Sequence, residues 1–367
     1  AEDVLNKVPM VTVDQEGEVA LRGNANVKIL VNGRPNRTGE GGRTVDNIPA
    51  SLIDKVEVIT SPSAKYDPDG MAGIINIVLK KGKYEGLNGN IKINGKINKN
   101  ASMDEMNGFT AYGNYRGEKW NLYSSVNVNS RRRVIGGNRQ AITTYTDTTG
   151  SKDDSIQSID FDFDNNSDRF GYSLKFGADY SINEHLIVNG ELNYDQHLHT
   201  GNNEQIYSAV DIRRIKEEDF DDNYDLEGFM DINQTFDNPD QELNFSISYD
   251  VEKDNESENL LPEDNDTTSD TTSLYQNMKT VDVDFSYRSP INDKSKIELG
   301  YDGRINDNEE TMDFQIASFN GENTFSYDRS IHGFYFEYDH RMNERFSIKP
   351  SVRYEHISKD ISFTTEK

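Results

Sequence analysis

Apolar and polar residues alternate over much of the chain after residue 85. Phe170, Tyr172, Leu174, Phe176, Ala178 and Tyr180 are separated by Gly, Ser, Lys and Asp residues, and residues 243–251, 281–287 and 346–355 follow the same rule. A period of two predicts β-strands with one apolar and one polar face. We expect runs of about 10–14 residues, longer than the 5–6 of an ordinary soluble strand and suited to tilted strands that cross a membrane.

The links between these runs alternate in length. Short turns fall at 116–119, 181–184, 236–241, 290–295 and 341–344, and long polar links at 132–167, 255–272 and 306–324. Short turns on one side and long loops on the other are typical of outer-membrane β-barrels. About eleven strands fit into 86–367, roughly half of a 22-stranded transporter barrel. The other half would belong to a second polypeptide or, as we prefer, to a longer chain of which this sequence is a part.

Residues 1–85 have a different pattern and predict a small α+β domain. Ala1–Val8 is an amphipathic helical stretch that Pro9 ends, and short apolar runs follow up to Val31. Asn32-Gly33 is a tight-turn dipeptide. Residues 49–53 suggest a short helix before a strand at 56–59, and 73–79 is nearly all apolar, as in a strand buried on both faces.

Composition and charge narrow the function classes. The chain carries a net charge of −26, but residues 1–85 hold 11 basic and 12 acidic residues, so the acidic excess lies in 86–367. Without a basic stripe, no nucleic-acid partner is expected. The absence of cysteine excludes disulfides and thiolate sites, and no apolar run is long enough for a transmembrane helix. The chain opens without a signal peptide, so we expect a processed or truncated start.

Five motifs in residues 1–85 resemble the plug domain of TonB-dependent outer-membrane receptors, most closely those of Bacteroidetes-type bacteria. In order, they are Asp3-Val4-Leu5 with Pro9-Met10-Val11, Leu21-Arg22-Gly23, Ile29-Leu30-Val31-Asn32-Gly33, Ile53-Asp54-Lys55-Val56-Glu57-Val58, and 66–81. Met10 and Asp67 depart from the family pattern, which has Gly at both places. A complete member would begin earlier, with a TonB-binding segment.

The resemblance implies a mainly β protein: a plug domain at 1–85, incomplete at its start, and the first part of an antiparallel transmembrane barrel at 86–367. It implies a bacterial outer-membrane transporter that takes up a scarce nutrient with energy relayed by TonB. Outer-membrane lipid, lipopolysaccharide and a small or medium-sized nutrient would be its other partners, with no cofactor. One alternative is a surface receptor that signals or scaffolds without transport. A soluble all-β binding protein is another, unless the apolar strand faces form one continuous band.

Two sets of plug residues are candidates for function. The resemblance assigns Arg22 and Glu57 to coupling between plug and barrel, although both also suit ordinary surface positions. The Gly-rich link 33–46 carries Arg34, Arg37 and Arg43, whose guanidinium groups suit a carboxylate or phosphate on a ligand. A plain solvated loop explains the same residues.

Other polar groups in the barrel segment have simpler explanations. His197 and His199 share one strand face but lack a third ligand, so we expect no metal site. Arg131-Arg132-Arg133 ends a predicted strand, where it would meet lipopolysaccharide phosphates or extend from the membrane edge into water. No nucleophile–base pattern, phosphate loop or carboxylate pair is found, so no enzymatic activity is predicted.

Overall fold

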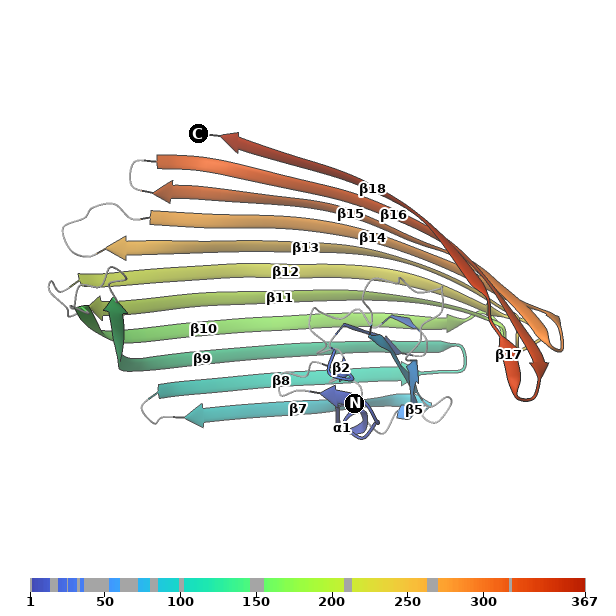
Figure 1. Cartoon of the computed structure of the whole chain (residues 1–367). Coiled ribbons are helices and arrows are strands. Elements are labelled where there is room, and N and C mark those ends of the chain that lie inside the picture. Colours follow the sequence, from blue (N-terminus) through green and yellow to red (C-terminus); the bar gives the residue numbers. More distant parts are fainter. Residues whose placement is uncertain are drawn as a thin grey trace.

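The computed structural model describes residues 2–13, 19–24, 26–31, 34–35, 53–59, 72–79, 85–98, 102–145, 155–207, 213–262, 270–316 and 319–366. Most of the described chain forms one curved antiparallel sheet of twelve strands, in which each strand from β7 to β16 pairs with the next in sequence (Figure 1). The strands are β7 (Gly86–Asn98), β8 (Ser102–Arg116), β9 (Trp120–Tyr145), β10 (Ser155–Ser181), β11 (Leu186–Tyr207), β12 (Arg213–Thr235), β13 (Glu242–Pro262), β14 (Asp270–Asn292), β15 (Ser295–Ile316), β16 (Phe319–Asn343), β17 (Phe346–Ile348) and β18 (Ser351–Glu366). Because β17 and β18 both pair with β16, the described strands fill eleven positions, as the sequence predicted.

One face of this sheet carries a continuous apolar band. Leu174 pairs with Val126 on β9 and with Tyr194 on β11, and Tyr194 pairs in turn with Leu226. Leu174 is 44% exposed, so this face has no protein covering it. The rings of Trp120 and Tyr180 stack at 4.1 Å near the short-turn ends of their strands. A continuous apolar band of this kind is what lipid requires and what a soluble binding protein lacks.

The strands are longer than the sequence pattern suggested. Strands β9 to β16 run for 21–27 residues, and most of the predicted long links at 132–167, 255–272 and 306–324 are strand. The alternation is clear only where one face must be apolar. Farther along, both faces are rich in Asp, Asn and Ser while the ladder of backbone hydrogen bonds continues, so periodicity could not mark the strand ends. The predicted short turns are confirmed.

The plug segment folds as a separate small unit. It contains α1 (Glu2–Leu5), a two-stranded sheet of β1 (Val11–Val13) and β2 (Val19–Leu21), and a four-stranded sheet in the order β4-β3-β6-β5. The latter strands are β3 (Val27–Val31), β4 (Arg34–Pro35), β5 (Ile53–Ile59) and β6 (Gly73–Leu79). Among the described residues, no helix has the length and apolarity to cross a membrane.

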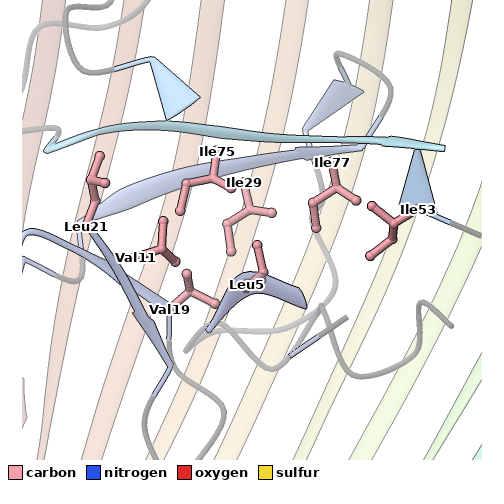
Figure 2. Packing of buried hydrophobic residues seen from close by; sticks show 8 residues of the cluster. All are labelled: Leu5, Val11, Val19, Leu21, Ile29, Ile53, Ile75 and Ile77. Atoms are coloured by element: carbon pink, nitrogen blue, oxygen red, sulfur yellow. The ribbon is translucent and has the colours of Figure 1, made fainter. Parts of the chain in front are cut away.

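An aliphatic core joins the two plug sheets and α1 (Figure 2). Its buried members are Leu5, Val11, Val19, Leu21, Ile29, Ile53, Ile75 and Ile77. Strand β6 lies between β3 and β5, which explains its nearly unbroken apolar sequence. Val31 pairs with Arg34, and the Asn-Gly dipeptide between them, predicted as a tight turn, lies outside the described residues. Strand β5 begins at Ile53, earlier than predicted, and the helix expected at 49–53 otherwise lies outside the described residues.

Candidate functional site

The four-stranded plug sheet has a second face, opposite the aliphatic core. Alternation and register place Lys28 and Leu30 of β3, Glu57 of β5, and Ile74 and Asn76 of β6 on it. Leu30 and Ile74 are buried although neither belongs to the aliphatic core. This face therefore combines buried apolar groups with three polar side chains.

Lys28 lies near enough to the large sheet to act electrostatically on one of its carboxylates. Its ammonium group interacts electrostatically with the Asp302 carboxylate on β15. Asp302 follows Tyr301, which pairs with Phe334 on the apolar face, so alternation places Asp302 on the opposite, polar face. The plug thus lies on the polar side of the wall, and Figure 1 shows it in front of one face of the large sheet.

Glu57, predicted to couple plug and barrel, is held within the plug. Its Oε2 accepts a hydrogen bond of 2.8 Å from Nδ2 of Asn76, and its Oε1 lies 2.5 Å from Nζ of Lys55. The hydrogen bond from Lys55, followed by that from Asn76, lowers the pKa of the Glu57 carboxyl below its usual value. The same partnership raises the pKa of Lys55. Glu57 is therefore a fixed negative charge on the face that Lys28 also occupies.

Arg22 lies in a strained turn rather than on a strand. Its φ of 55° and that of Met10, 71°, are in the left-handed region, and Gly23 follows with 81°. The Arg22 backbone N–H donates to the Met10 carbonyl at 2.8 Å, and its Nε contacts the Met10 sulfur at 3.4 Å. The Gly of the family pattern is replaced by Met10 without loss of the turn conformation. These contacts of Arg22 lie within the plug.

The predicted ligand loop is mostly outside the described residues. Arg34 is the first residue of the short strand β4, and its backbone pairs with Val31. Arg37 and Arg43 fall in a segment that the structure does not describe. Their role in ligand binding stays a prediction.

Strand alternation separates the three consecutive arginines of β9. Arg132 pairs with Asp168, and its Nε lies 3.7 Å from the Asp168 carboxylate, on the same face as Phe170. Arg131 and Arg133 point to the opposite, inward face. There Arg131 pairs with Arg169, and all three inward arginines line a hollow of about 230 Å³.

A hydrogen-bonded row crosses three strands beside this hollow. Nε2 of His199 lies 2.9 Å from Oγ of Ser167, and its Nδ1 lies 3.0 Å from Asp221 and 3.1 Å from Asp219. His199 is thus oriented by neighbours on both sides. Sequence reasoning, which considered His199 as a metal ligand and rejected that role, missed this row and also missed Lys28 and Arg169. Lys28 was detectable as the one charged residue in the apolar run 27–31, whereas Arg169 gave no signal without the strand register.

Two family comparisons cover different parts of the chain. Residues 1–74 match the TonB-dependent Receptor Plug Domain. Residues 234–367 match the Outer membrane protein beta-barrel family. These matches agree with the plug unit and the large antiparallel sheet.

Curated relatives match only in part. The chain is 40% identical over 85 residues to the vitamin B12 transporter BtuB of Vibrio vulnificus, and the match covers 21% of this chain and 14% of that protein. It is 34% identical over 118 residues to an iron-regulated outer membrane virulence protein of Vibrio cholerae, covering 28% and 18%. Among solved structures, the ferric yersiniabactin uptake receptor FyuA of Yersinia pestis aligns with a TM-score of 0.41 at 10% identity, over 98% of this chain and 76% of that chain.

Proposed function

Because this chain belongs to the TonB-dependent outer-membrane receptors, with its plug at one end and barrel strands after it, we propose that it takes up a scarce nutrient across the bacterial outer membrane. The observation that carries the proposal is the electrostatic interaction between Lys28 of the plug and Asp302 of the wall, where Arg353 and Arg304 act on the same carboxylate. It lies on the polar side of a wall whose other side is lipid-compatible. A plug in that position blocks a water-filled passage until something moves it.

The proposed cycle uses the second plug face as the part that releases. Lys28 and Glu57 lie on this face, and electrostatic interactions between exposed charged groups contribute little individually and break readily. A pull by TonB on the chain before the plug would separate this face from the wall and open a path. Arg22 would act at the turn that joins the β1–β2 sheet to β3, in keeping with the coupling role predicted for it.

The remaining predicted roles fit the same cycle. We assign the plug to residues 1–85 and the barrel strands to 86–367, with Gly86 as the first residue of the large sheet. Arg34, Arg37 and Arg43 would meet the nutrient on the plug. Arg132, on the lipid side of the wall, would meet lipopolysaccharide phosphates, although its pairing with Asp168 offsets part of its charge.

Cross-linking tests the proposal directly because the chain has no cysteine of its own. The Lys28→Cys, Asp302→Cys double variant would be joined by a cleavable thiol cross-linker in cells that lack other TonB-dependent receptors. Radiolabelled cyanocobalamin and a panel of ferric siderophores are the probes. We expect at least one to accumulate only with TonB present, to stop accumulating after cross-linking and to resume after reduction.

The Lys28→Cys single variant, treated with the same reagent, is the matched control and should keep its uptake. Failure of every probe to accumulate, or undiminished accumulation after cross-linking, would overturn the proposal.

A further inference from the structure

Three arginines gather on the inward face of the wall, at the level where the apolar band ends. Arg131 and Arg133 lie on β9 and Arg169 on β10, and Arg131 is directly opposite Arg169. Phe170 is the last residue of the apolar band on β10, one residue from Arg169 and on the other face. The cluster therefore faces the lumen just above the lipid, on the side with the long strand extensions.

Holding these charges together costs stability. Like charges directly opposite each other on neighbouring strands repel. Arg169 forms no ion pair with the side chains that the structure describes, whereas Arg133 lies directly opposite Asp104 of β8. Arg169 faces Arg131 across the β9–β10 pair, and its charge is thus incompletely neutralised, in a barrel segment that is otherwise strongly acidic. A bound anion would remove the repulsion.

The hollow between these arginines offers groups that can hydrogen-bond to an oxyanion. It measures about 230 Å³ and is lined by the three arginines with Asn165, Ser167, His199, Gly201 and Asp219. Ser167 and Asn165 add neutral hydrogen-bonding groups, and Gly201 keeps one wall free of a side chain. Asp219 is the one carboxylate of the lining, and it is engaged by His199 at 3.1 Å.

We propose that this hollow binds a carboxylate or phosphate group of the nutrient before the nutrient reaches the plug. This inference rests on the proposed function and adds the chemical class of the ligand. Guanidinium groups suit such ligands because they donate two parallel hydrogen bonds to two oxygen atoms. Arg131 and Arg169 come from adjacent strands, so one oxyanion group spans them, and Arg133 contacts a second group or the same one.

Lipopolysaccharide also carries phosphate groups. Strand alternation distinguishes a lipopolysaccharide site from a nutrient site, because the two ligands meet opposite faces of the wall. Inward arginines face solutes in the lumen, whereas Arg132 faces the lipid side. Arg132→Gln is therefore a matched control: it removes the same charge from the same strand, one residue away, on the opposite face.

The test titrates inorganic pyrophosphate into the full receptor chain in detergent by calorimetry at low salt. Because hydrogen bonds to charged groups are individually strong, Arg131→Gln and Arg169→Gln should each weaken binding about tenfold. Arg132→Gln should leave pyrophosphate affinity unchanged and instead weaken binding of lipopolysaccharide micelles. Gel mobility of heated and unheated samples checks that each variant is folded.

No pyrophosphate binding by the parent chain would overturn the inference, and so would equal losses in Arg131→Gln and Arg132→Gln. Reduced lipopolysaccharide binding in Arg131→Gln with pyrophosphate affinity intact would also overturn it, in favour of a lipid site. The outcome is separable from the proposed function. Uptake that depends on TonB without pyrophosphate binding leaves transport standing, whereas binding without uptake leaves the anion site standing.

Discussion

The plug and the wall differ in where they place their apolar side chains. Nearly all the buried apolar side chains that the structure describes lie in residues 5–77, while the buried polar ones lie between Asn189 and Glu337. The plug hides aliphatic groups from water, as a soluble domain does. The wall exposes them, with Phe176 58% exposed, because lipid is their solvent. Apolar burial therefore stabilises the first unit, and a backbone ladder with lipid contact stabilises the second.

The largest effect expected from this contrast follows from a core deletion in the plug. Ile75 is fully buried, so Ile75→Ala should destabilise the plug by about 2–5 kcal/mol. Hydrogen exchange should accelerate across β3, β5 and β6 while the amides of β9 to β16 stay protected. Equal acceleration in both units would show that plug and wall share one stability.

A charge on the lipid face should be nearly as damaging to the wall. Leu174 lies in the middle of the apolar band, so Leu174→Arg should cost about 2–4 kcal/mol. Ser173→Arg is the control, because the neighbouring position faces the aqueous side. Urea unfolding in lipid vesicles measures both. Similar losses in the two variants would contradict the assignment of faces.

Gly73 sharpens the comparison because close packing in the plug leaves no room at the start of β6. A Cβ there would lie 2.6 Å from Leu21 Cδ2 and 2.7 Å from the Ile59 carbonyl oxygen, at a φ of +153°. Gly73→Ala should cost about 1–3 kcal/mol from backbone strain and crowding together. Gly23→Ala measures the cost of backbone strain alone, since Gly23 has a φ of +81° and a Cβ added there would meet no atom within 4 Å. The melting temperature of the plug should fall further for Gly73→Ala than for Gly23→Ala.

Met10 offers a gain instead of a loss. A non-Gly residue in the left-handed region is strained by about 1–2 kcal/mol. Glycine removes this strain, but its larger conformational entropy in the unfolded state cancels about half of the gain in stability. Met10→Gly should therefore stabilise the plug by roughly 0.5–1 kcal/mol, while the exposed wall residue Met342 offers no such gain. A lower plug melting temperature would mean that the sulfur contact with Arg22 matters more than the strain.

The smallest effect concerns pH. The pKa of Glu57 is lowered in the folded plug, so its contribution is present above the ordinary carboxyl pKa and is lost as pH falls through the folded value. Because Glu57 is partly exposed, we expect only a few tenths of a kcal/mol. In Glu57→Gln, the free energy of unfolding of the plug should depend less steeply on pH on the acid side, measured by chemical unfolding between pH 3 and about 6. An unchanged limb would assign the acid sensitivity to other carboxyls.

The sequence predicted the faces of the wall better than the lengths of its strands. The alternation of apolar and polar residues around Leu174 marks the part of the wall that faces lipid. The alternation is lost where both faces meet water, although the strands remain paired. In the plug, the apolar run of β6 was sufficient to predict a strand buried on both faces, and the Asn-Gly dipeptide lies between the paired residues Val31 and Arg34. The site depends on register: Arg169 meets Arg131 only because β9 and β10 are aligned as they are, and no local pattern encodes that alignment.

The long extensions of β9 to β16 shape the outside of the cell envelope. About half of each strand is enough for the bilayer, and the remainder, tilted by about 45°, rises a further 25–35 Å or so. This part is a stiff, hydrated and acidic extension of the barrel wall, about as tall as the hydrocarbon layer beneath it is thick. Any macromolecule that approaches the bacterium here touches its rim well before it reaches lipid.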